Sequence, residues 1–151
     1  MKLDEIYPYW PETHDEFVDW LRYIDDNTWN SAPLGPAFGS IRLLVVRFIQ
    51  LERQWMIGVV QNREVDPLIA SDLVARADVL SQFEATRAAT SVYFAPLAYE
   101  ALRSVRTAPA DPEINEIERN VPLSWILWLI VQNELMMHGQ VRALAKQLRN
   151  R

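Results

Sequence analysis

Apolar residues recur three and four positions apart over four long stretches of the chain. In the first stretch Phe17, Trp20, Leu21 and Ile24 share one face of a helix. The second stretch is apolar nearly all round, a pattern typical of a helix that is buried on several sides. We therefore predict four long helices, at about residues 12–27, 38–61, 67–90 and 122–149.

The prolines mark the ends of these stretches, because proline cannot occupy a helix interior without losing a hydrogen bond. Pro67 and Pro122 are predicted to open the third and fourth helices. Between these helices, Tyr99–Val105 is predicted to form a short helix and Asp111–Glu118 a capped turn or short helix. No stretch alternates strictly between apolar and polar residues, so no strand is expected. The pattern predicts an all-α four-helix bundle that forms a single domain over residues 1–151.

The composition excludes several kinds of site. The chain has 151 residues, no cysteine, two histidines and a net charge of −5. No disulfide, cysteine nucleophile, cysteine-bound metal or single-chain three-histidine site is possible. Acidic residues outnumber basic ones, so nucleic acid is not an expected partner. The N-terminus has no apolar signal region and the longest apolar run, Trp125–Val131, is too short to cross a membrane, so we expect a cytoplasmic protein.

Few polar residues in the predicted helices could carry chemistry. Glu134 and His138 lie four apart in the last helix, and the simpler interpretation is a surface pair. The alternative is a carboxylate–imidazole pair for proton transfer, or half of a metal site. His14, near a Thr13/Glu16 capping box, is expected to serve as an ordinary surface residue at the start of the first helix.

Arg47 stands in the most apolar helix. It either extends to the surface or pairs inside with Glu52, Glu134 or Asn133. The tryptophans at 20, 55, 125 and 128 are expected to be core or pocket walls.

Two segments resemble motifs of the DinB/YfiT-like superfamily. The segment Arg47–Trp55 is similar to a second-helix motif, commonly His-Leu-Ala-x-x-Glu-Arg-x-Trp. The segment Asn133–Val141 is similar to a last-helix motif, commonly His-x-x-His-His-Arg-Gly-Gln-Ile. The resemblance implies an up-down-down-up four-helix bundle with a long crossover before the last helix. It also implies a divalent metal on three histidines, often thiol-dependent S-transferase or isomerase activity, and often a homodimer.

The three ligand positions of those motifs carry no histidine here. They are occupied by Arg47, Asn133 and Met137. Arginine is a cation without an acceptor and would repel a metal ion, so we expect no metal and no cofactor at these positions. The residue before Gly139 is His138 instead of arginine, whereas four other motif positions match: Glu52, Trp55, Gly139 and Gln140.

Three functions remain open. The first is a metal-free protein that binds a small, possibly anionic molecule or a partner in the bundle cleft. Its expected ligand-binding residues are Arg47, Asn133, Met137, Glu52, Trp55 and Gln140. The second is an enzyme in which Glu134 or His138 acts as acid or base while Arg47 holds the substrate's negative charge. The third is a metal enzyme with relocated ligands, namely His138, Glu134 and Glu52. A homodimer is also expected if several of the six tryptophans lie at the surface.

Overall fold

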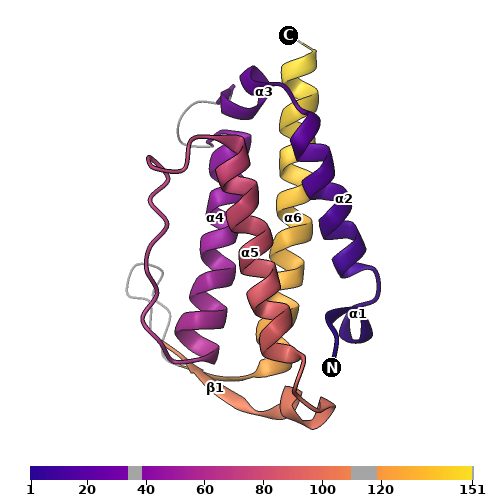
Figure 1. Cartoon of the computed structure of the whole chain (residues 1–151), viewed down its shortest axis with the longest axis vertical. Coiled ribbons are helices and arrows are strands. Elements are labelled where there is room, and N and C mark those ends of the chain that lie inside the picture. Colours follow the sequence, from indigo (N-terminus) through magenta and orange to yellow (C-terminus); the bar gives the residue numbers. More distant parts are fainter. Residues whose placement is uncertain (34–38, 110–118, 151) are drawn as a thin grey trace.

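The computed structural model describes residues 1–33, 39–109 and 119–150. Within these ranges the chain is mostly helical, with four long helices and a small two-stranded hairpin (Figure 1). The long helices are α2 (Trp10–Tyr23), α4 (Ile41–Arg53), α5 (Arg76–Phe94) and α6 (Leu123–Arg149). The shorter elements are α1 (Leu3–Ile6), α3 (Asp26–Asn30), the π-helix η1 (Gln54–Val60), the 3-10 helix η2 (Tyr99–Arg103), β1 (Val105–Ala108) and β2 (Arg119–Pro122).

The long helices run along the long axis of the molecule. Helix α4 packs against both α5 and α6, and α2 contacts α5. Residues 61–75 contain no helix and run back along one side, from the end of η1 to the start of α5 (Figure 1). None of the helices within the described ranges is long and apolar enough to span a membrane.

The first predicted helix starts earlier than expected and is broken in two. Helix α2 begins at Trp10, after Tyr9 in a left-handed conformation with φ 71°, and the Thr13 N–H already donates to the Tyr9 carbonyl. The predicted Thr13 capping box is therefore wrong. A second helix, α3, starts where the Asp25 side chain accepts a hydrogen bond from the Thr28 N–H at 2.8 Å. This cap explains why the helical spacing breaks before residue 27.

The third predicted helix starts at Arg76, so its prediction from Pro67 is wrong. The apolar residues Leu68, Ala70 and Leu73 pack against the core from a non-helical segment. Side chains of α4 hold that segment: Gln50 accepts from the Leu68 N–H, and Arg42 donates to the carbonyls of residues 70 and 73. The helical spacing before residue 76 thus reflects packing onto α4.

The connection before α6 contains strands, which corrects the expectation of an entirely α-helical chain. Strands β1 and β2 pair antiparallel, with Val105 opposite Pro122 and Ala108 opposite Arg119. Each strand has four residues, too few to produce a clear alternation in the sequence. The predicted helix at 99–105 is the shorter 3-10 helix η2. The predicted turn at 111–118, and the start of the second predicted helix at Phe38, lie outside the described residues.

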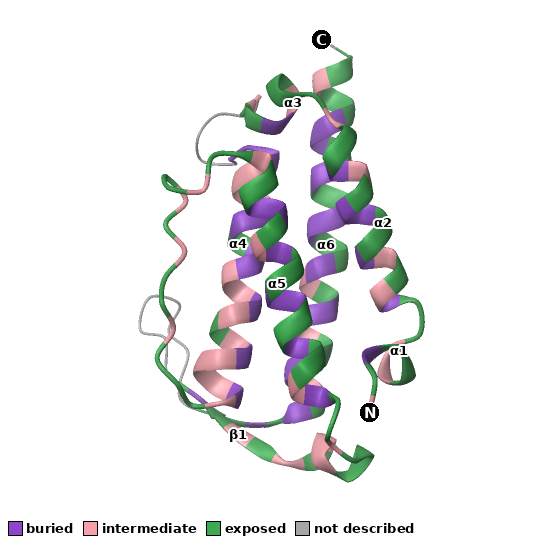
Figure 2. Cartoon of the chain, in the orientation of Figure 1, coloured by how far each residue is buried: buried purple, intermediate pink, exposed green. Residues whose placement is uncertain are grey.

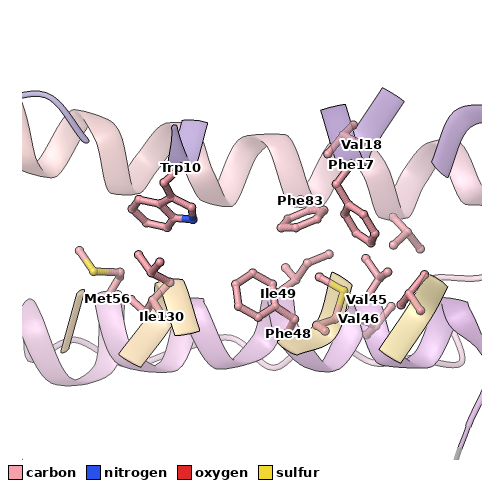
Figure 3. Packing of buried hydrophobic residues seen from close by; sticks show 14 of the residues in the cluster. Trp10, Phe17, Val18, Val45, Val46, Phe48, Ile49, Met56, Phe83 and Ile130 are labelled. Carbon is pink, nitrogen blue, oxygen red and sulfur yellow. The ribbon is translucent and has the colours of Figure 1, made fainter. Parts of the chain in front are cut away.

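The core lies between the four long helices. Buried residues face inward on each helix and exposed residues face outward (Figure 2). Figure 3 shows Phe17 of α2, Phe48 and Ile49 of α4 and Phe83 of α5 side by side in this core. Packing of this kind places the polar residues of the same helices at fixed positions relative to one another.

Candidate functional site

A cavity of about 580 Å³ lies between α4 and α6. Its lining brings together Arg47, Asn133, Met137 and Gln140, four of the predicted ligand-binding residues. The remaining lining residues are mostly apolar: Leu44, Phe48, Leu51, Met136, Ala143, Leu144 and Gln147. The volume lies within the roughly 300–1,000 Å³ that is common for small-molecule sites.

The cavity has one charged residue in its lining, and that residue is a cation. Arg47 is exposed and forms no hydrogen bond or ion pair with any residue of the described ranges. Asn133 donates through Nδ2 to the Leu129 carbonyl at 2.8 Å, which leaves its Oδ1 available as an acceptor. No aspartate or glutamate belongs to the lining. The cavity therefore offers a guanidinium that has no partner among the described residues, set against an apolar wall.

The turn before α4 favours glycine at position 39, because of its positive φ and its approach to the Leu43 side chain. Ser40 caps α4 by accepting from the Leu43 N–H at 3.2 Å, and Gly39 before it has φ +76°. A Cβ at position 39 would lie 3.3 Å from the Leu43 Cβ and 3.7 Å from Nη1 of Arg47. Glycine at this position thus satisfies both the backbone conformation and the close approach.

Two of the predicted ligand-binding residues lie elsewhere. Trp55 is partly buried in η1 and packs edge-to-face against Trp125, with ring centroids 5.7 Å apart. Glu52 is fully buried and belongs to a separate cluster of charged side chains. Arg47 extends to the surface, which is the first of the two predicted positions for its side chain. Neither Glu52 nor Glu134 forms an ion pair with Arg47.

The buried cluster is centred on Glu134 of α6. Its Oε2 accepts hydrogen bonds from Nε1 of Trp10 at 2.6 Å and from Nη2 of Arg87 at 2.5 Å. The ring nitrogens Nδ1 of His14 and Nε2 of His138 lie 2.8 Å and 3.2 Å from its Oε1. Burial favours the neutral acid, but the bonds to His138 and His14 and the charge of Arg87 together hold the pKa of Glu134 well below its usual value.

Arg87 of α5 joins Glu134 to a second carboxylate. Its Nε and Nη2 donate to the two oxygens of Glu52, each at 3.1 Å, and Thr90 adds a bond to Oε1 of Glu52 at 2.7 Å. The guanidinium carbon also lies 4.1 Å from the ring centroid of Trp10. Burial disfavours the charge on Arg87, but the two carboxylates outweigh it and raise the pKa of the guanidinium. The cluster thus links all four long helices.

These positions correct two predictions from the sequence. Glu134 and His138 are 0% and 5% exposed, so they do not form a surface pair. His14 is 3% exposed and lies one turn inside α2, so its expected surface role is wrong. Its ring packs in a T-shaped arrangement with Phe83, with ring centroids 4.5 Å apart, whereas the His138 ring stacks on Phe17 with centroids 3.8 Å apart.

Arg87 and Trp10 were not predicted as site residues. Arg87 follows the core residue Phe83 by four positions, so helical spacing alone places it on the buried face of α5. That spacing could have identified Arg87 as a buried residue. No pattern in the sequence indicates a role for Trp10, because it precedes the stretch in which apolar residues recur at helical spacing.

The chain matches no protein-family profile and no curated protein. Among solved structures it is similar to a conserved protein of a locus from Enterococcus faecalis. That similarity covers 100% of this chain and 99% of the other, with a TM-score of 0.64 and 14% sequence identity. At this identity the likeness shows the fold alone: a mostly helical domain with four long helices.

Proposed function

We propose that this protein is a DinB-like bundle that binds a small carboxylate-containing molecule between α4 and α6, without the metal of that superfamily. The observation that carries the proposal is the position of Arg47, Asn133 and Met137. The resemblance gives these three positions to metal-binding histidines, and they line one cavity. The simplest explanation is a binding site at the place where the superfamily holds its metal, with side chains that bind a different kind of ligand.

The course of the chain supports the up-down-down-up topology in this proposal. Residues 61–75 run back along the molecule between the end of η1 and the start of α5 (Figure 1). Such a return allows α4 and α5 to run in the same direction, as an up-down-down-up order requires. The hairpin and η2 then form the long crossover into α6.

The lining favours an amphipathic anion. Arginine presents planar N–H donors whose geometry matches a carboxylate. The unpaired guanidinium of Arg47 would bind the anionic end, while Phe48, Met137 and Leu144 would contact an apolar body. Asn133 and Gln140 add amide groups for a further polar atom of the ligand.

The residues present do not fit the metal that the resemblance implies. The cavity lining holds no histidine, aspartate or glutamate. Within the described ranges, no group of three or more such side chains is placed to hold a metal ion. The relocated set of His138, Glu134 and Glu52 is unsuitable, because the Arg87 cation lies between the two carboxylates.

The alternative proposal is an acid–base enzyme that uses Glu134 or His138. Both residues lie on α6 next to the cavity residues Asn133 and Met137, but neither belongs to the lining. Glu134 is fully buried and four nitrogen atoms surround its carboxylate. We therefore favour a structural role for Glu134 and His138, in which they fix α6 relative to the other helices.

Calorimetric titration with hexanoate, compared with neutral hexanamide, tests the proposed function. We expect saturable binding of hexanoate and weaker binding of hexanamide. The Arg47→Met variant should keep its fold and lose at least about tenfold in hexanoate affinity, since a hydrogen bond to a charged group contributes about 1.5–3 kcal/mol. The matched control is Arg103→Met, which removes an exposed arginine of η2 that lines none of the cavities described.

Two results would overturn the proposal. One is hexanoate binding that is unchanged in Arg47→Met, which would show that the guanidinium does not bind the anion. The other is stoichiometric zinc or nickel in untagged protein, which would show that a metal site exists despite the substitutions.

A further inference from the structure

A second, smaller cavity lies on the opposite side of α4, against α5. Its volume is about 110 Å³. One wall comes from the end of α4 and from η1, and the other from α5. The lining residues are Arg53, Met56, Ile57, Gln61, Gln82, Ala85, Thr86, Ala89 and Thr90. Ala85 and Ala89 are exposed and Gln61 is half-buried, so the cavity reaches the molecular surface, whereas Met56, Thr86 and Thr90 are buried at its inner end.

Two buried donors of this cavity have no acceptor among the described residues. The Thr86 side chain is 7% exposed and its Oγ1 has no hydrogen-bond partner. The Nε of Arg53 is also buried without a partner, although Nη2 of the same side chain donates to the Asp66 carbonyl at 2.9 Å. A buried polar group without a partner destabilises the fold, so a ligand that accepts from both donors would relieve this cost.

The charge of the lining selects the kind of ligand. Arg53 forms no ion pair with a residue of the described ranges, and the lining contains no carboxylate. Glu52, which precedes Arg53 in the chain, is bonded to Arg87 and to the hydroxyl of Thr90. The donors that remain, a guanidinium N–H and a hydroxyl, favour an oxyanion.

The wall formed by η1 is unusual. A π-helix of seven residues, Gln54–Val60, continues directly from α4 and supplies Met56 and Ile57 to the cavity. Segments of π-helix are rare and occur frequently at functional sites. The π-helix indicates a functional site here independently of the two donors that lack a partner.

We infer that this cavity is a second ligand site, which binds a small planar oxyanion such as a carboxylate or bicarbonate through Arg53 and Thr86. A water molecule takes up roughly 30 Å³ of the liquid, so the cavity has room for only a few heavy atoms. The site is separate from the α4–α6 cavity, with which it shares no lining residue. It therefore does not depend on the proposed function.

The test is a titration of the protein with sodium formate, followed by amide and arginine Nε–H resonances in ¹H–¹⁵N NMR spectra. Sodium chloride at equal ionic strength is the reference. We expect saturable shifts confined to residues 53–61 and 82–90, including the Nε–H of Arg53. The Thr86→Val variant keeps the side-chain shape and should weaken formate binding about tenfold, the effect of one hydrogen bond to a charged group. Arg53→Met should abolish it, and Arg103→Met should leave it unchanged.

Each other outcome counts against the inference. Equal shifts with chloride would show an effect of ionic strength, and unchanged affinity in Thr86→Val would show that the hydroxyl does not bind formate. Shifts around Arg47 alone would place formate in the α4–α6 cavity and leave this site without a ligand. If Arg53→Met disturbs the segment after η1, the result for Thr86→Val still decides.

Discussion

Glu134 has the most hydrogen-bonded carboxylate of the buried cluster. Removing one partner of a buried ion pair leaves the other charge without compensation, which is much more destabilising than losing a surface pair. Because Glu134 also bonds to residues of α2, its charge stabilises the contact between two helices at opposite ends of the sequence. Its contribution to folding should therefore be large.

The substitution Glu134→Gln measures this contribution. The variant keeps the shape of the side chain but leaves Arg87 with only Glu52 as a charged partner. We expect the free energy of unfolding to fall by about 1.5–3 kcal/mol, because charge-assisted hydrogen bonds are lost while Arg87 stays paired with Glu52, measured by urea denaturation at neutral pH. The control is Glu84→Gln, which removes an exposed pair with Arg22 and should change stability by only about 0–1 kcal/mol. Equal effects of the two substitutions would contradict a special role for the buried carboxylate.

Stability should also depend on pH through Glu134. Its pKa in the folded protein is lower than the usual value of 4.5, which we take for the unfolded chain. The stabilisation is therefore fully present above that value and is lost as the pH falls from it toward the folded-state pKa. Urea denaturation from pH 7 to pH 3 should show a smaller difference between wild type and Glu134→Gln at the acidic end. A difference that stays constant over this range would contradict the low pKa.

At the level of elements, α6 was predictable and α5 was only partly so. Helix α6 follows directly after Pro122 and keeps its helical spacing to the end, so its predicted bounds agree with the structure to within a residue. The start of α5 was misplaced because Leu73 lies four positions before Ala77 and seven before Leu80, a helical spacing, although it packs from a non-helical segment. The π-helix η1 gave no signal, because its apolar residues continue the pattern of α4.

One part of the candidate site was predictable from the sequence and the other part was not. The cavity residues Arg47, Asn133 and Met137 could be found because two short motifs, each within one helix, contain them. The buried cluster could not be found in this way. The buried Glu134 is hydrogen-bonded to Trp10 and His14, which are 124 and 120 positions away in the sequence. Spacing along one helix carries no information about such partners.

The cap of α4 allows a prediction about a single element. Ser40 is 3% exposed and its side chain accepts from the Leu43 N–H at the start of the helix that carries Arg47. The Ser40→Ala variant should lose about 1 kcal/mol of stability, measured by thermal or urea denaturation. Ser81→Ala, an exposed position in the interior of α5, is the control and should leave stability unchanged or raise it by a few tenths of a kcal/mol, because alanine is the better helix former. A Ser40→Ala variant as stable as wild type would show that the cap contributes nothing.

For the whole molecule, the outer face of α6 is the surface best suited to a partner. The face carries Trp128, Leu135 and Met136, which are 44%, 49% and 56% exposed. Between Leu123 and Val141 the one residue with a formal charge is Glu134, which is buried, although 23% of the whole chain is charged. Interface centres are poor in charge and rich in aromatic residues and methionine. An uncharged face of this kind is compatible with its own copy, so a homodimer remains our expectation.

This expectation is tested by light scattering coupled to size-exclusion chromatography. Wild-type protein should elute at twice the chain mass of 17.6 kDa at high concentration, and the dimer fraction should fall on dilution. Leu135→Lys places a charge on the α6 face and should give a monomer, whereas Val92→Lys, at an equally apolar and 73% exposed position of α5, should not.

Because Met136 also lines the α4–α6 cavity, dimer formation through this face would cover part of the cavity rim. Hexanoate affinity should then change with protein concentration in the wild type and not in Leu135→Lys. A wild-type monomer at every concentration would exclude α6 as a contact between copies and leave its apolar face to another partner.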